Sequence, residues 1–139
     1  MVDVVRAMRL LRSVTDDVAV LRAEASAADA RRIDPMWLRG VKYGFITAIE
    51  ACIDVAQHVC ATTGLGPPDS NADAMRLLAA HGIIPASLAD SMRQAVGFRN
   101  VLVHDYVRVD DDVVTARLDD LSPLESFVDA LTAYVDDDR

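Results

Sequence analysis

The spacing of apolar residues predicts helices along the whole chain. From Val4 to Ala28 the apolar positions recur every three or four residues, which places them on one side of a helix and is incompatible with a strand. This stripe consists of Val4, Ala7, Leu11, Val14, Val18, Leu21, Ala25 and Ala28. The opposite side is charged and is expected to face solvent; it carries Arg6, Arg9, Arg12 and Asp16.

A second, longer helix is predicted to begin at Asp34 and Pro35 and to end at Gly64. Aspartate caps a helix start, proline fits the first turn because its missing N–H needs no partner there, and glycine often follows a helix end. One apolar stripe comprises Leu38, Val41, Phe45, Ala48, Cys52, Val55 and Val59, and a second comprises Ile46, Ile49, Ile53, Ala56 and Cys60. Two stripes exceed one buried face, so we expect this helix to pack on its own bundle and on another subunit of a homodimer.

The second half of the chain predicts a loop and further helices. In order, these are a loop over residues 64–70, a short helix over 71–81, a helix from Pro85 to Gly97 or a little beyond, a helical segment from Asp110, and a last helix starting at a capping box of Ser122, Pro123 and Glu125. Leu124, Val128, Leu131 and Val135 turn the last helix inward, and residues 136–139 form a solvated tail. The expected fold is all-α, an up-and-down bundle of four main helices plus one short helix, in a single domain over residues 1–139.

Composition narrows the class of protein. A chain of 139 residues with 52% hydrophobic and 26% charged residues suits one folded domain, and no run approaches the roughly 18 apolar residues of a membrane span. Arginines near the N-terminus leave no room for a signal peptide, so we expect a cytoplasmic protein without membrane contact. The net charge of −8 excludes a broad basic surface for nucleic acid, so any such contact must be local.

The two cysteines, Cys52 and Cys60, are expected to be free thiols. They lie eight residues apart on the second predicted helix, which separates them by about 12 Å along its axis, too far for a disulfide. The chain has no metal-type cysteine spacing, so the sequence gives little support to a zinc site and we expect no bound metal.

Residues 97–106 crowd Arg99, Asn100, His104 and Tyr106 among apolar residues that must be buried. On an ideal helix Arg99 and His104 would point about 140° apart, and His104 and Tyr106 about 200° apart. If these side chains act together, the segment must leave regular helix, or dimer symmetry must bring two copies together across a shared cleft.

These residue types suit cleavage of RNA. A histidine can remove the proton of a ribose 2′-OH at neutral pH, while an arginine stabilises the charge that grows on the attacked phosphate. Asn100 would orient His104 or bind a phosphate oxygen, and Tyr106 would donate to the phosphate or stack on a base. The residue types alone also fit a structural reading, in which Arg99 pairs with a carboxylate, His104 caps a helix end, and Tyr106 is a half-buried ring.

The run Arg99, four residues, His104, one residue, Tyr106 resembles the R-x4-H-x-Y motif of HepT-type toxins, which belong to the HEPN superfamily of small all-helical ribonucleases. Asn100 after the arginine, the stretch over residues 82–104 and the segment over residues 48–54 are also similar to that family. The resemblance covers nearly the whole chain. It implies a metal-independent endoribonuclease without cofactor, in which Arg99 and His104 are the catalytic pair and the cleft for RNA lies between the two subunits of a homodimer.

The resemblance also implies a regulatory partner. Tyr106 matches the tyrosine that an MntA-like nucleotidyltransferase antitoxin modifies with AMP from ATP in related systems. Bulky negative charge beside His104 would then keep out the substrate phosphate. Asp105 adds a further negative charge at this position.

Other polar residues of the second helix have weaker readings. Glu50, Asp54 and His58 repeat every four residues, which fits a metal site, a polar stripe that lines the dimer cleft, or plain surface pairing. In the second reading Asp54 orients His104 or Arg99. Asp54 and Asn100 are then the supporting residues of the site. Trp37 and Tyr43 are expected to be packing anchors, and His81 a helix-end residue.

Two rival functions remain open at this point. One is a catalytically inactive HEPN module that binds nucleotide or scaffolds a nucleotidyltransferase through the same cationic pocket. The other is a helical ligand-binding or scaffold protein with no chemistry of its own.

Overall fold

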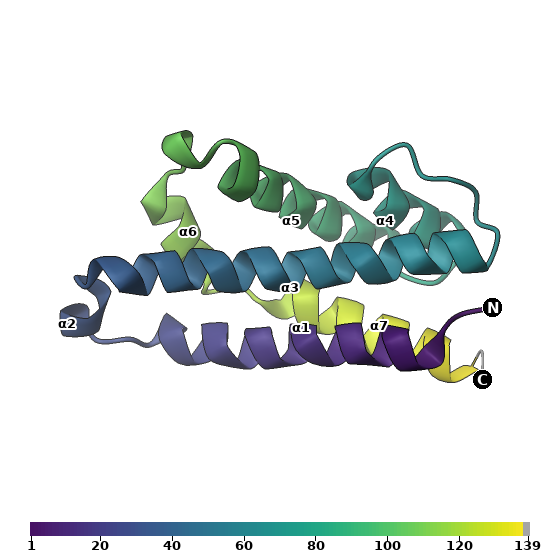
Figure 1. The fold of residues 1–139 in the computed structure, drawn as a ribbon, viewed down its shortest axis with the longest axis horizontal. Helices are drawn as coiled ribbons and strands as arrows, with labels where there is room; N and C mark the ends of the chain where they lie inside the picture. Colours follow the sequence, from purple (N-terminus) through teal and green to yellow (C-terminus); the bar gives the residue numbers. More distant parts are fainter. Residues whose placement is uncertain (138–139) are drawn as a thin grey trace.

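The longest helix, α3, runs through the middle of the structure, a computed structural model that describes residues 1–137. Helix α1 lies alongside α3, α5 runs along another side of α3, and α7 packs behind α1 (Figure 1). The elements are α1 (Val4–Ala25), α2 (Asp29–Arg32), α3 (Pro35–Thr62), α4 (Asn71–Ala80), α5 (Ala86–His104), η1 (Tyr106–Arg108), α6 (Asp111–Arg117) and α7 (Ser122–Asp137). The described residues contain no strand, so the predicted all-α bundle is confirmed.

Several helix ends lie where the sequence placed them. The Asp34 carboxylate accepts a hydrogen bond from the Met36 N–H at 2.9 Å, with Pro35 in the first turn of α3. Gly64 and Gly82 follow α3 and α4 with φ of +70° and +73°, a backbone conformation that side chains with a Cβ rarely adopt. These local signals are therefore sufficient to delimit α3 and α4.

Helix α1 is shorter than predicted, because the chain turns into the unpredicted α2 after Ala25. The Arg32 guanidinium donates to the carbonyl oxygens of Ala25 at 2.7 Å and Ala27 at 3.0 Å, so it satisfies acceptors that the end of α1 leaves open. Glu24 accepts hydrogen bonds from Arg31 and from the Trp37 indole at 2.8 Å, and these contacts lower the pKa of Glu24 to about 2. These side-chain contacts therefore end α1, although no glycine or proline follows the helix directly.

Two other local predictions are wrong. Helix α5 continues past Gly97 to His104, because Gly97 has no positive φ and Leu102, further along, is buried. The capping box does not form either. Helix α7 does begin at Ser122 as predicted, but Ser122 donates its N–H and hydroxyl to Asp120 Oδ1, while Glu125 pairs with Arg22 of α1.

Both apolar stripes of α3 are buried within this one chain. Ile49, Ile53, Ala56 and Cys60 of the second stripe are as inaccessible as Ala48, Cys52 and Val55 of the first, because α1 covers one side and α4 and α5 cover the other. The second stripe is therefore covered by this chain itself and is not available to another subunit. The two cysteines are free and buried as expected, and burial raises the pKa of each thiol.

The length and apolar composition of α3 would also allow it to cross a membrane. This differs from the expectation that no part of the chain is apolar enough for a membrane span. In this fold the apolar residues that produce that property form the core of the bundle. The property is common among core helices, so it is weak support for a membrane span. The solvent-facing side of α3 carries Tyr43, Glu50 and Asp54.

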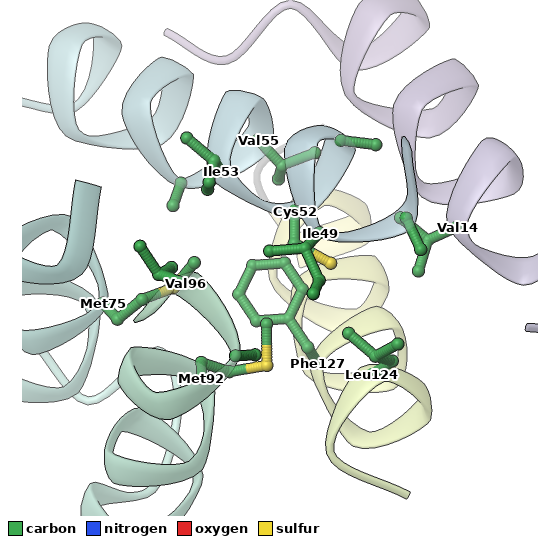
Figure 2. Packing of buried hydrophobic residues seen from close by; sticks show 14 of the residues in the cluster. Val14, Ile49, Cys52, Ile53, Val55, Met75, Met92, Val96, Leu124 and Phe127 are labelled. Carbon is green, nitrogen blue, oxygen red and sulfur yellow. The ribbon is translucent and has the colours of Figure 1, made fainter. Parts of the chain in front are cut away.

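The ring of Phe127 lies at the centre of the core. It comes from α7 and is surrounded by Ile49 and Cys52 of α3 and by Met92 of α5 (Figure 2). Phe127 and Met92 are fully buried, so the ring joins three helices through packing alone. The sequence reading of α7 had left this residue out of the inward-facing set.

We predict that Phe127→Ala lowers the free energy of unfolding by about 3–5 kcal/mol, because it removes a large buried ring and leaves a cavity among three helices. Urea unfolding followed by circular dichroism measures this change. Val20→Ala, at an exposed position of α1, is the control and should leave the free energy of unfolding nearly unchanged. Equal effects of the two substitutions would contradict the placement of Phe127 in the core.

Candidate active site at the end of helix α5

The side chains of interest lie where α5 passes over α3. The rings of Phe45 and Phe98 meet edge to face there, with centroids 5.3 Å apart, and the Arg117 guanidinium lies over the Phe98 ring, 4.8 Å from its centroid. This contact fixes the two helices against each other next to Arg99. Positions Glu50 and Arg99 consequently face each other across the junction of α3 and α5.

Arg99 is held by hydrogen bonds on two sides of its guanidinium. Glu50 Oε2 accepts from Nε at 2.8 Å and lies 2.5 Å from Nη2, and Asn100 Oδ1 accepts from Nη1 at 2.9 Å. Only 15% of the Arg99 side chain is exposed, compared with 43% of the Glu50 side chain. Part of the structural reading of Arg99 therefore holds, since the arginine does pair with a carboxylate.

His104 and Tyr106 lie at the surface, at the far end of the same helix. His104 is the last residue of α5, and the Asp105 N–H closes the helix on the Val101 carbonyl at 2.9 Å. Tyr106 starts the short η1 turn and is 70% exposed, so it is not the half-buried ring of the structural reading. Within the described chain, the His104 and Tyr106 side chains form no hydrogen bond. Both groups are thus accessible from solvent.

Arg99 and His104 do not converge within one chain. They belong to one continuous helix, where five residues separate them by about 7.5 Å along the axis and by about 140° around it. The alternative in which the segment leaves regular helix before His104 is therefore wrong. The alternative in which two copies share a cleft is the one that still brings the two groups together.

Asp54 lies near Arg99 but makes no hydrogen bond to it; Glu50 occupies that place. Burial and the nearby Glu50 carboxylate raise the pKa of Asp54, and the Arg6 and Arg99 guanidiniums partly oppose this shift. Glu50 was named from the sequence as part of the polar stripe of α3, without a connection to Arg99. Only the packing angle of α3 on α5 selects Glu50 over Asp54.

The other polar residues named from the sequence have structural contacts. His58 Nε2 accepts a hydrogen bond from the Asp3 N–H at 2.9 Å, and among residues 1–137 no group of three His, Cys, Asp or Glu side chains could hold a metal ion. His81 ends α4 and contacts the Leu77 carbonyl through Nδ1, as expected. Trp37 is a buried anchor as expected, whereas Tyr43 is 68% exposed, so the prediction for Tyr43 is wrong.

Two hollows of the molecule lie away from these side chains. One lies between α5 and α7 and is lined by Leu88, Ser91, Pro123 and other residues of these helices and their flanks. Another lies between α1 and α7, around Arg22 and Glu125. Neither includes Arg99, His104 or Tyr106. The candidate site is therefore an open surface in a single chain.

The fold and the motif together define a class of protein. A helical bundle with arginine and histidine five positions apart near the end of one helix, followed by an exposed tyrosine, is a HEPN-type helical protein. Residues 6–131 match the family model described as ribonuclease HepT-like. The chain belongs to this HepT-like family.

Individual relatives agree with this assignment. The chain is 39% identical over 85 residues to the mRNA nuclease HepT of Shewanella oneidensis, an alignment that covers 60% of this chain and 64% of that protein. Its fold matches the tri-AMPylated HEPN toxin of Shewanella oneidensis, solved in complex with its MNT antitoxin, with a TM-score of 0.85 and 27% identity over 96% of this chain and 99% of that one. The Bacillus subtilis cytosolic protein YutE matches with a TM-score of 0.86, over 99% of this chain and 93% of that one, and at 18% identity it supports the fold alone.

We predict that Asp54→Asn raises the melting temperature at pH 7. A raised carboxyl pKa in the folded state means that ionised Asp54 destabilises the fold; this penalty is present above the folded pKa and disappears as the pH falls below the unfolded value of about 3.9. The gain from Asn should therefore shrink as the pH is lowered towards 4. Thermal unfolding across this pH range measures it, with the exposed Asp16→Asn of α1 as a control that should change little. A lower melting temperature for Asp54→Asn at pH 7 would mean that attraction to Arg6 and Arg99 outweighs burial.

Proposed function

We propose that this chain is the endoribonuclease toxin of a toxin–antitoxin pair, and that it cleaves RNA in the cytoplasm as a homodimer without metal or cofactor. The observation that carries the proposal is the complete Arg99, His104 and Tyr106 motif at the end of α5, in a chain whose residues 6–131 match the HepT-like ribonuclease family. The names of the Shewanella oneidensis relatives, an mRNA nuclease and a toxin bound to its antitoxin, support the same function.

The geometry of α5 is the reason for proposing a dimer. Cleavage needs a base and a cation at the same phosphate, and in one chain His104 points away from Arg99. A twofold pairing that buries the end of α5 would place His104 of each subunit near Arg99 of the other and form two equivalent sites. Exposed apolar side chains at this end of the molecule support a contact there; they are Val101, Val107 and Val113.

The proposed reaction needs only the groups of these residues. His104 in its neutral form accepts the proton of the 2′-OH while O2′ bonds to phosphorus, and the bond from phosphorus to O5′ breaks. The products are a 2′,3′-cyclic phosphate and a 5′-hydroxyl, whose oxygen takes its proton from water as it leaves. Arg99 stabilises the phosphate oxygens as their charge grows.

The acidic surface restricts how RNA is bound. With a net charge of −8 the chain lacks the broad electrostatic attraction of proteins that coat nucleic acid. Affinity must therefore come from Arg99 and a few neighbouring groups. This favours a flexible single strand that enters a narrow site over a duplex held along its length.

Tyr106 is the proposed point of control by an MntA-like nucleotidyltransferase antitoxin. The residue is 70% exposed, and its phenol oxygen would attack the α-phosphorus of ATP, which forms a tyrosyl adenylate and releases pyrophosphate. The adenylate places a negative charge and a large group two residues from His104. Both effects would exclude the substrate phosphate from the site.

We predict that Arg99→Ala and His104→Ala each lower the rate of RNA cleavage by about 10²–10⁴-fold, because each removes one of the two groups that act on the phosphate. Purified protein is incubated with RNA in EDTA, and the ends of the products are analysed for cyclic phosphate. His81→Ala and Arg93→Ala provide matched controls, since His81 also ends a helix and Arg93 is exposed on α5 itself.

The outcomes separate the candidate functions. Retained cleavage in either catalytic variant, or a strict requirement for a divalent metal, would contradict the mechanism. A wild-type protein that cleaves no RNA yet forms a stable complex with its nucleotidyltransferase would identify the inactive scaffold module instead. A monomer that is fully active would contradict the shared cleft.

We predict that incubation with the partner nucleotidyltransferase and ATP adds adenylate to the wild-type chain and abolishes its RNA cleavage, and that Tyr106→Phe resists both changes because it lacks the acceptor hydroxyl. Mass spectrometry of the intact protein and the cleavage assay measure the two effects. Tyr43→Phe is the control, because Tyr43 is equally exposed but lies on α3. Full modification of Tyr106→Phe would place the acceptor elsewhere.

A further inference from the structure

The ion pair between Glu50 and Arg99 has a geometry that leaves a defined part of the arginine free. Glu50 approaches the guanidinium from the side, where one oxygen, Oε2, contacts both Nε and Nη2. Asn100 takes one hydrogen of Nη1. A guanidinium has five N–H donors, so one donor on Nη1 and one on Nη2 have no partner in the described chain. These two donors remain available to a ligand.

We propose that Glu50 is the positioning residue for Arg99, which it holds so that the end of its fork meets the phosphate. This inference rests on the proposed ribonuclease function and adds a residue to it. Two free donors on one guanidinium can bind two oxygens of a phosphate group. The carboxylate therefore aligns the arginine instead of blocking it.

The surroundings of the pair support a positioning role. The contact between Phe45 and Phe98 lies beside it and fixes the two helices that carry Glu50 and Arg99. The Arg99 side chain is only 15% exposed, so its aliphatic part is held by packing while Glu50 sets the orientation of its head. An arginine without these restraints would lose conformational entropy on binding each phosphate, which a preorganised side chain avoids.

The negative charge of Glu50 has a separate effect on substrate binding. It offsets the charge of Arg99, and Asp54 lies close enough to be affected by both groups. A neutral residue with the same shape and an acceptor oxygen should therefore keep the alignment of Arg99 and bind RNA more tightly. A residue without an acceptor should lose the alignment.

The test compares Glu50→Gln with Glu50→Ala in the full-length protein, with kcat and KM for RNA measured separately. Glu50→Ala should lower kcat by about 10²-fold, the scale of effect expected when a reacting group is misplaced by about 1 Å. Glu50→Gln should retain most of kcat, because its side-chain oxygen still accepts from the Arg99 Nε–H, and should lower KM. A loss due only to reduced stability would affect the melting temperature without this split between kcat and KM.

Glu125→Ala is the matched control. Glu125 also pairs with an arginine of another helix, Arg22 of α1, and lies away from the motif, so its loss should leave kcat and KM unchanged. A second measurement does not depend on activity. In ¹⁵N NMR spectra without RNA, the Arg99 Nε–H should exchange slowly with solvent in the wild type and in Glu50→Gln, and rapidly in Glu50→Ala.

The outcomes distinguish this inference from the proposed function. If the wild type cleaves RNA and Glu50→Ala matches it, or if Glu50→Gln loses as much of kcat as Glu50→Ala, Glu50 does not position Arg99. If the wild type cleaves no RNA, the ribonuclease function fails, while the exchange of the Arg99 Nε–H still reports whether Glu50 restrains the guanidinium.

Discussion

The constraint that organises this molecule is the burial of α3 on all but one of its sides. Its two apolar stripes require cover from neighbouring helices, and the chain supplies that cover itself with α1 on one side and α4 and α5 on the other. Phe127 of α7 completes the core (Figure 2). What remains exposed of α3 is a narrow polar strip, and Glu50 in that strip meets Arg99 of α5. The position of the candidate site thus follows from how the core is closed.

Signals within a few residues of sequence were enough to predict much of this fold. The Asp34 cap with Pro35, and the glycines after α3 and α4, delimit helices correctly because the conformations they require are local. The end of α5 was wrongly predicted near Gly97, because a glycine inside a helix differs from one that ends it only in its backbone conformation. The end of α1, where Arg32 of α2 donates to the Ala25 carbonyl, and the pairing of Glu125 with Arg22 depend on other helices, so no local pattern could reveal them.

The residues of the candidate site were likewise predictable only in part. Arg99, His104 and Tyr106 could be selected from the sequence because they form a compact motif within eight residues. Glu50 could not be preferred over Asp54, because both occupy the polar strip of α3 and only the crossing of α3 and α5 decides which carboxylate reaches the arginine. The expected dimer had been argued from the second stripe of α3. That stripe is internal, and the proposal of a dimer now rests on the end of α5 instead.

The continuity of α5 has a practical consequence for inhibition. Since Arg99 and His104 are carried by the same unbroken helix, the interval between them within a subunit is as stiff as the helix itself. The adjustable quantity in the proposed dimer is the orientation of one subunit relative to the other. A small molecule bound between the subunits of such a dimer would disturb both active sites equally, and it would need no resemblance to a nucleotide.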